Sequence, residues 1–208
     1  MRKSDLHPEL QASCIAIPGR SGCYAVVPPP APSSVHVPQA DALFVLARRE
    51  MEHLTSVIAQ NRDFSDLVFH MLNRREAVDS SQIEGTHTGF DGLLIHELEA
   101  GTAEARQDDD ANATFAYVHA FVEGCRQIDA LGKEALTLGL IQELHRVLMG
   151  AQERVNPGEW RTVQNYIGIR LETATYVPPP VSELQRLMND LQGLLEYDPD
   201  GMKHVSIL

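Results

Sequence analysis

The chain has 208 residues, of which 43% are hydrophobic, and its 17 Lys and Arg against 29 Asp and Glu give a formal net charge of −12. This length and apolar content suffice for one domain with its own core, with or without an irregular leader. The acidic excess disfavours direct binding to nucleic acid, because clustered Lys and Arg hold the phosphate backbone, and the pairs Arg48–Arg49 and Arg74–Arg75 form no larger cluster.

Cysteine content and hydropathy exclude further classes of protein. Cys14, Cys23 and Cys125 are three in number and contain no Cys-x-x-Cys pair, so neither a disulfide framework nor a zinc knuckle is expected. The longest clearly apolar run, residues 42–47, is far shorter than the about 20 residues needed to cross a bilayer. These features predict a cytoplasmic protein without a metal site and without a membrane partner.

Residues 1–38 are expected to form an irregular leader. Gly19, Gly22, the run Pro28–Pro30 and Pro38 oppose continuous helix or central strand. Such a segment is typical of a tethered extended leader, and less often of an SH3-type ligand.

Helical periodicity begins at Asp41, a candidate cap for a helix whose apolar stripe runs from Leu43 to Ile58. A second helix is predicted to start after Ser65 or Asp66, to continue through Ser80–Glu84 and to end at Gly85. The apolar residues between Phe90 and Leu98 predict a third, short helix.

Three consecutive aspartates, Asp108–Asp110, precede the next apolar stripe, residues 115–125. We interpret them as a helix N-terminal cap rather than a metal site, because negative charge is favoured at that end of the helix dipole. Thr137 then opens a helix that Gly150 closes. His145 lies next to the apolar stripe of this helix, so packing or a hydrogen bond to a carbonyl is expected for it rather than catalysis.

Between Asn156 and Pro180 the helical period gives way to β-prone residues around Gly168, which predict a two-stranded hairpin. Ser182 and Gln185 have capping-box spacing before a last amphipathic helix, Leu184–Leu195. The predicted fold is therefore mainly α, with one small β-hairpin.

The segment Ser80-Ser81-Gln82-Ile83-Glu84-Gly85 permits two interpretations. It is either an ordinary helix C-terminus with Gly85 in a left-handed conformation, or a device that presents the Glu84 carboxylate to an arginine. A carboxylate at this position opposes the helix dipole by a few tenths of a kcal/mol. The chain has no Gly-x-x-x-x-Gly-Lys-Ser/Thr loop, Gly-x-Gly-x-x-Gly turn or Gly-x-Ser-x-Gly elbow.

A second motif far downstream reads Pro157-Gly158-Glu159-Trp160-Arg161-Thr162-Val163-Gln164-Asn165-Tyr166-Ile167-Gly168 and continues as Ala174-Thr175-Tyr176-Val177-Pro178-Pro179-Pro180. Together with Ser80–Gly85, this order resembles the N-terminal half of Fic-family proteins, which transfer AMP from ATP to protein hydroxyls. The similarity covers about residues 40–196, and it implies a Fic-like helical bundle with a hairpin called the flap.

The resemblance also implies roles for single residues. Ser80, Glu84 and Gly85 match the family's inhibitory helix, in which the glutamate lies beside the nucleotide and pairs with an arginine that otherwise holds the γ-phosphate. Arginine binds carboxylate and phosphate through the same fork, so the two compete. The flap lays a target backbone beside the active site by strand addition. Its matching residues are Arg161, Thr162, Asn165, Ile167, Gly168, Thr175 and Tyr176.

One family feature is missing from this sequence. The catalytic loop His-Pro-Phe-x-Asp/Glu-Gly-Asn-Gly-Arg, which supplies the general base and holds Mg²⁺ and phosphates, does not occur, and the sequence after Glu196 does not continue the family pattern. ATP and Mg²⁺ are therefore implied only for a complete family member. We expect a chain truncated or frame-shifted near residue 197, with no catalytic residue of its own and inactive as given.

The expected organisation is an irregular leader (1–38), a helical domain with the inhibitory helix (39–150), and the flap with the start of the Fic core (151–208). Expected partners are a target protein or a separate Fic core, with a homo-oligomer also possible. The main alternative is a standalone, antitoxin-like module that inhibits a separate Fic core through Glu84. A further alternative is a degenerate chain whose apolar helix faces stay exposed.

Overall fold

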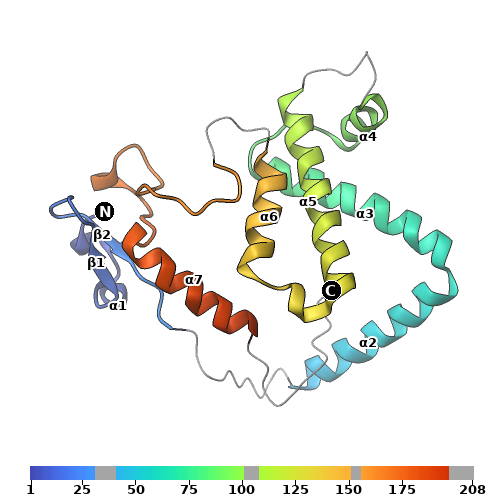
Figure 1. Ribbon diagram of the computed structural model, residues 1–208, viewed down its shortest axis with the longest axis horizontal. Coiled ribbons are helices and arrows are strands. Elements are labelled where there is room, and N and C mark those ends of the chain that lie inside the picture. Colours follow the sequence, from blue (N-terminus) through green and yellow to red (C-terminus); the bar gives the residue numbers. More distant parts are fainter. Residues whose placement is uncertain (31–40, 101–107, 151–155, 197–208) are drawn as a thin grey trace. The chain divides into compact units, whose positions relative to one another are not determined.

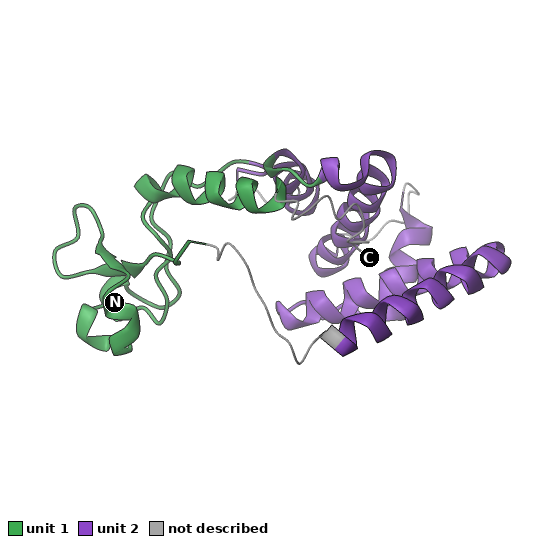
Figure 2. Ribbon diagram, turned by 90° about the horizontal axis from the view of Figure 1, so that it is seen from below, with its two compact units in different colours: residues 1–33, 136–138, 159–208 green, residues 34–135, 139–158 purple. Residues whose placement is uncertain are grey.

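The structure is a computed structural model that describes residues 1–30, 41–100, 108–150 and 156–196. In this part of the chain the fold is mainly helical, with seven α-helices and one small antiparallel sheet (Figure 1). None of the described helices is long and apolar enough to cross a membrane. The chain divides into two compact units, which are described separately (Figure 2).

Unit 1 comprises residues 1–33, 136–138 and 159–208. Its short elements are the 3-10 helix η1 (Lys3–Asp5), helix α1 (Pro8–Gln11), strands β1 (Cys14–Ala16) and β2 (Tyr24–Val26), the 3-10 helix η4 (Leu171–Thr173) and helix α7 (Val181–Glu196). The two strands pair in the register Cys14↔Val26, Ile15↔Ala25 and Ala16↔Tyr24.

The core of unit 1 joins segments far apart in the sequence. Met1, Ile17, Cys23 and Ala25 are buried together with Leu171, Ala174 and Val177. The N-terminal amine of Met1 donates a hydrogen bond to the carbonyl of Leu171, and the Met1 carbonyl accepts from Tyr24 N–H at 2.9 Å. Residues 1–30 thus differ from the expected irregular leader. Gly19 and Gly22, which had indicated an irregular segment, lie in the turn between the strands with φ of 72° and 73°.

Unit 2 comprises residues 34–135 and 139–158. It contains helices α2 (Asp41–Gln60), α3 (Arg62–Ile83), α4 (Phe90–Glu99), α5 (Asp109–Leu131) and the 3-10 helix η3 (Gly132–Ala135). Most of helix α6 (Leu138–Met149) also belongs to it. Ala77 and Val78 of α3, Leu93 of α4 and Val118 of α5 form its buried cluster.

Most predicted helices are confirmed, with shifts at their ends. Helix α3 begins at Arg62, directly after Asn61, rather than after Ser65 or Asp66. Helix α7 begins at Val181, so Ser182 is helical instead of capping. The Asp41 side chain, the other candidate cap, lies outside what the structure describes. The Asp108 interpretation is confirmed: its carboxylate accepts the Ala111 N–H at 3.0 Å, as an N-cap does.

The two-stranded hairpin predicted for residues 156–180 is not formed. In the described residues 156–180 there is only an isolated antiparallel bridge, Ile167↔Tyr176, and the two-stranded sheet lies in residues 14–26 instead. Gly168 and the 3-10 turn η4 bend the chain between the bridge partners, and Leu171 and Ala174 turn into the core. The β-prone composition of this segment therefore does not form the predicted two-stranded hairpin.

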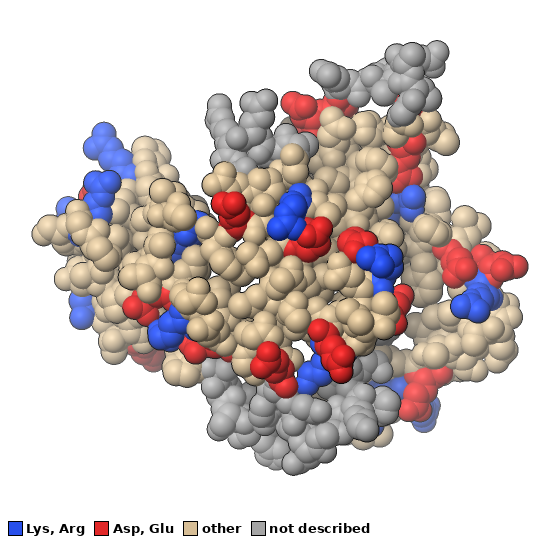
Figure 3. Space-filling view, in the orientation of Figure 1, with Lys and Arg blue, Asp and Glu red and all other residues tan. Residues whose placement is uncertain are grey.

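Charges are interspersed on the surface. In Figure 3 many blue side chains lie next to red ones, and no continuous basic surface is seen on the face shown. This agrees with ion pairs between close neighbours in sequence, such as Arg126–Glu123 and Arg186–Glu183.

Candidate functional site

Helix α3 ends in a glycine cap. The Gly85 N–H donates to the Gln82 carbonyl and the Thr86 N–H to the Ser81 carbonyl, both at 3.1 Å, and Gly85 has φ of 99°. This is the paired bonding of a Schellman motif, which needs a left-handed residue after the last helical one. The predicted stop at Gly85 is confirmed, and its local geometry is that of an ordinary helix end.

Glu84 is the C-cap residue of this helix, and its side chain is exposed. The carboxylate forms no hydrogen bond or ion pair with another described residue. The nearby polar groups differ: Ser80 Oγ donates to Glu76 Oε1 at 2.6 Å, and Gln82 Nε2 donates to the Thr88 carbonyl at 3.1 Å. Glu84 thus carries an unneutralised negative charge at the negative end of a helix, where it destabilises.

The chain after Gly85 is fixed to the start of α5. The His87 N–H donates to Asp110 Oδ2 at 2.8 Å, while Thr88 is buried. Asp110 and Asp108 therefore satisfy backbone N–H groups. Among the described residues, no group of three or more His, Cys, Asp or Glu side chains could hold a metal ion.

An ion pair that the sequence analysis missed holds α3 to α4. Arg74 Nε donates to Glu97 Oε2 at 2.7 Å, and these side chains are only 20% and 16% exposed. Glu97 therefore has a structural role in this unit. The two residues are 23 positions apart, and no local pattern could have paired them.

The residues matched to the flap lie in unit 1. The Ile167 carbonyl accepts from Thr175 N–H at 2.9 Å and from Thr175 Oγ1 at 3.0 Å, and the Ile167 N–H donates to the Tyr176 carbonyl at 2.9 Å. Gly168 has φ of 141°, and an added Cβ would lie 3.0 Å from Ala174 Cα. The bridge thus requires a residue without a side chain at this position.

Arg161 braces the same segment. Its guanidinium donates to the Val163 carbonyl at 3.1 Å and to the Pro179 carbonyl. Partial burial lowers the pKa of Arg161, and the neighbouring Tyr176 offsets part of this shift. Gln164, which the sequence analysis did not single out, adds a bond from Nε2 to the Pro178 carbonyl at 2.9 Å. The side chains of Thr162 and Asn165 form no hydrogen bond with another described residue.

The outer edge of this segment is apolar and exposed. Ile167 is 63% exposed and Ile169 is 92% exposed, while Tyr176 is half exposed. Tyr176 and Arg161 also border an apolar groove formed by prolines and by one face of α7, which includes Leu184, Leu187 and Leu191. The structure therefore brings Arg161, Ile167, Gly168, Thr175 and Tyr176 together, whereas Ser80, Glu84 and Gly85 belong to the other unit.

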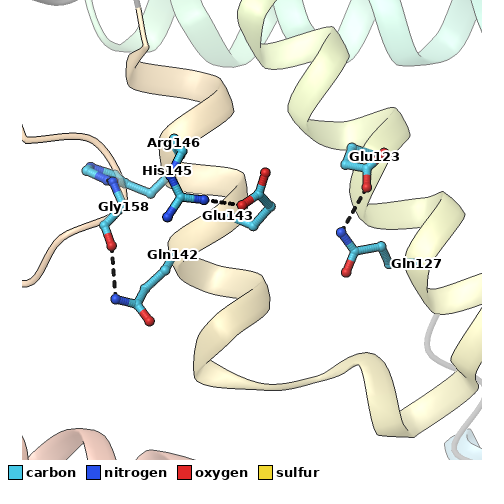
Figure 4. A network of polar contacts seen from close by, with 7 residues as sticks. All are labelled: Glu123, Gln127, Gln142, Glu143, His145, Arg146 and Gly158. Carbon is cyan, nitrogen blue, oxygen red and sulfur yellow. Dashed lines mark hydrogen bonds and ion pairs between the residues drawn. The ribbon is translucent and has the colours of Figure 1, made fainter.

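A polar clamp fixes the start of the second motif. His145 Nδ1 accepts the Gly158 N–H at 2.8 Å, and Gln142 Nε2 donates to the Gly158 carbonyl at 2.9 Å (Figure 4). Both side chains come from α6, three residues apart, and so share one face. His145 was expected to pack or to bind a carbonyl; it binds a backbone N–H instead. Glu143 and Arg146 pair beside it.

One of the two sequence motifs lies in a segment that matches a known protein family. Residues 42–126 match the family model described as Fic/DOC family N-terminal, and the match includes Ser80–Gly85. The chain therefore carries a Fic/DOC family N-terminal domain. The match does not include the flap residues, and no match to a catalytic Fic domain accompanies it. No curated protein matches the chain.

The described residues do not fit an ATP–Mg²⁺ site on their own. Glu84, which the resemblance places beside a nucleotide, carries the same sign of charge as a phosphate and repels it. The Arg161 guanidinium is bound to backbone carbonyls. The chemical groups that remain free are the Glu84 carboxylate in unit 2 and the exposed backbone around Ile167 in unit 1.

Proposed function

We propose that this chain is the regulatory and target-docking part of a Fic-type AMP-transferase, and that it restrains AMP transfer through Glu84. The supporting observation is that the Fic/DOC N-terminal match contains an exposed, unpaired carboxylate at the end of α3. In this proposal the chain contributes no catalytic residue, and its own residues bind and position.

The proposed partner of Glu84 is an arginine of a Fic core. A guanidinium presents a planar fork that fits a carboxylate as well as a phosphate, so an arginine held by Glu84 is withdrawn from phosphate binding. The carboxylate is free to accept such a fork, since no described residue competes for it. The helix dipole adds to the attraction, because it makes the C-terminus of α3 favourable for a cation.

The flap residues support the docking half of the proposal. Around Ile167 and Tyr176 the chain is extended, exposed and braced from behind by Arg161 and Gln164. An extended target peptide can add to such a backbone by main-chain hydrogen bonds. The apolar side chains of Ile167 and Ile169 would flank the peptide. A fixed backbone lowers the entropy that docking costs.

The test is an AMP-transfer assay with labelled ATP and Mg²⁺, in which the full chain is added to an active Fic core that lacks an inhibitory helix. We expect inhibition by the wild-type chain, loss of inhibition with Glu84→Gln, and unchanged inhibition with the exposed control Glu134→Gln. Equal inhibition by wild type and Glu84→Gln would overturn the regulatory role. Robust AMP transfer by the chain alone would overturn the absence of catalysis.

The second candidate function is a standalone, antitoxin-like module that binds a separate Fic core. It is favoured by the same free carboxylate, because the partner it lacks among the described residues could come from another protein. Titration of labelled chain with the isolated core distinguishes the two. Core binding that survives Ile167→Asp and fails with Glu84→Gln favours the inhibitor module. Binding of a target protein that survives Glu84→Gln and fails with Ile167→Asp favours docking through the flap.

A further inference from the structure

A large apolar side chain lies next to the free carboxylate of Glu84. Ile83 is the last residue of α3, and its side chain is 85% exposed. Among the large hydrophobic side chains in the described part of the chain, only that of Ile169 is more exposed, at 92%. A single exposed apolar residue is common on protein surfaces, so the position of Ile83 beside Glu84, and not its exposure alone, is what matters.

Ile83 and Glu84 lie on the same side of the last turn of α3. Ser80 is three residues before Ile83 and four before Glu84, so these two side chains flank that of Ser80. Ser80 is already engaged within the helix, because its Oγ donates to Glu76 Oε1 at 2.6 Å. The buried side of this helix end is formed by other residues, namely Ala77, Val78 and Ser81. A partner that binds Glu84 from the exposed side therefore also contacts Ile83.

The charges at this helix end suit a cation. Residues 76–91 contain no Lys or Arg and four acidic residues, Glu76, Asp79, Glu84 and Asp91. Asp79 pairs with Arg75, whereas the Glu84 carboxylate has no partner among the described residues. The negative end of the helix dipole adds to the attraction for a positive group.

An arginine fits this combination of groups better than a lysine. The guanidinium is more weakly hydrated than an ammonium, and its methylene stem packs along apolar surface. An ion pair that stays in contact with water strengthens an association by only about fivefold or less. Where water is excluded, the same pair is stronger and salt screens it less. Ile83 is placed to exclude water from one side of such a pair.

We propose that Ile83 and Glu84 form one contact site, in which Ile83 packs against the arginine stem and its apolar neighbours and shields the Glu84 ion pair from water. This inference rests on the proposed function, because the arginine belongs to the Fic core. Glu84 binds the guanidinium, and Ile83 is a positioning residue that acts through this pair. The matching surface of the core is an arginine in apolar surroundings rather than an isolated exposed charge.

The test is the AMP-transfer assay with an active Fic core that lacks an inhibitory helix, with the full chain added at several salt concentrations. We expect Ile83→Ala to raise the chain concentration for half inhibition at least about tenfold, and to make inhibition more sensitive to salt. Ile83→Leu keeps the apolar volume and should recover most of the inhibition. Leu98→Ala on α4, at a leucine that is 81% exposed, is the matched control and should inhibit as wild type does.

A second measurement needs no substitution. In the methyl-labelled wild-type chain, the NMR resonances of Ile83 should shift when the same core is added, and those of Leu98 should not. Methyl resonances of Ile83 that the core leaves unchanged would overturn the inference, even if a substituted chain failed to fold.

The assay separates a failure of this inference from a failure of the proposed function. Unchanged inhibition by Ile83→Ala, with inhibition lost in Glu84→Gln, would overturn the role of Ile83 alone. Equal inhibition by wild type and Glu84→Gln would overturn both. A weakened Ile83→Ala chain whose inhibition depends on salt as wild type does would show packing without shielding, and would also overturn the proposed role of Ile83.

Discussion

His145 accepts the backbone N–H of Gly158 through Nδ1 at 2.8 Å, and Gly158 is buried. An imidazole nitrogen accepts a hydrogen bond only without a proton, so this contact requires neutral His145 with its proton on Nε2. Together with the bond from Gln142 to the Gly158 carbonyl, it satisfies both backbone groups of one residue. The motif that begins at Pro157 is thereby attached to α6.

Removal of the His145 acceptor should destabilise the protein. We expect His145→Leu to cost about 1–3 kcal/mol in the free energy of unfolding, because it leaves the buried Gly158 N–H without a partner. His145→Asn retains an acceptor oxygen and should recover part of this loss. Urea unfolding of the two variants is the measurement. An equal loss in both would indicate that packing of the ring, rather than the hydrogen bond, stabilises the clamp.

Two glycine-to-alanine substitutions should have opposite signs. Gly158 has φ of 80°, and an added Cβ would lie 2.9 Å from the Gln142 carbonyl oxygen and 2.8 Å from Arg146 Nη2. Gly158→Ala should therefore cost more than the about 1–2 kcal/mol of the left-handed conformation alone. Gly193→Ala, within α7 and with no atom close to the added Cβ, should stabilise by about 0.5–1 kcal/mol. Thermal unfolding of both variants tests the pair, and a neutral Gly158→Ala would contradict the clamp geometry.

The ion pairs of Arg74 and Arg75 should differ in their effect on stability, although the two arginines are adjacent. Arg74→Met leaves the largely buried Glu97 carboxylate uncompensated and should cost about 2–3 kcal/mol. Arg75→Met breaks a pair with Asp79 whose side chains are 62% and 49% exposed, and should change stability by less than about 0.5 kcal/mol. Chemical denaturation measures both, and similar values would show that Arg74 does not hold α3 to α4.

Glu84 should reduce the stability of the isolated chain. Glu84→Gln removes a negative charge from the C-terminus of α3 and should stabilise by about 0.3–1 kcal/mol, an effect that salt reduces. Thermal unfolding at low and high ionic strength is the measurement. A destabilised variant would indicate that the carboxylate has a structural partner, which would also weaken its proposed role toward an arginine.

Glu123 should titrate far below an ordinary glutamate. Hydrogen bonds from Arg126, and then from Gln127, lower its pKa from 4.5 to about 2. Because the pKa of the folded state lies below that of the unfolded state, the contribution to stability is complete above about pH 4.5 and is lost as the pH falls toward 2. Carboxyl NMR titration should show this low value, with a shift back toward 4.5 in Arg126→Met. The Glu123 side chain is 29% exposed, so added salt should also shift its pKa back toward the ordinary value.

Local signals in the sequence were sufficient for most helices and for the end of α3. The aspartate that caps α5 and the glycine that ends α3 act on backbone groups within three to five residues, so short patterns encode them. Apolar periodicity located α4, α5 and α7 for the same reason, since it depends only on which residues share a helix face. The motifs around Glu84 and Gly158 were also visible as residue strings.

Contacts between distant segments were decided only in the folded chain. The glycines near residue 20 indicated an irregular leader, yet β1 and β2 form there. They are stabilised because apolar side chains of this segment pack against Leu171 and Val177, which are distant in the sequence. The pairing of Arg74 with Glu97 and the binding of His145 to a backbone N–H likewise depend on which surfaces meet. A β-prone run such as residues 163–177 does not determine strand pairing, because pairing depends on the three-dimensional arrangement of the neighbouring segments. This run contains the 3-10 turn η4 and one isolated bridge.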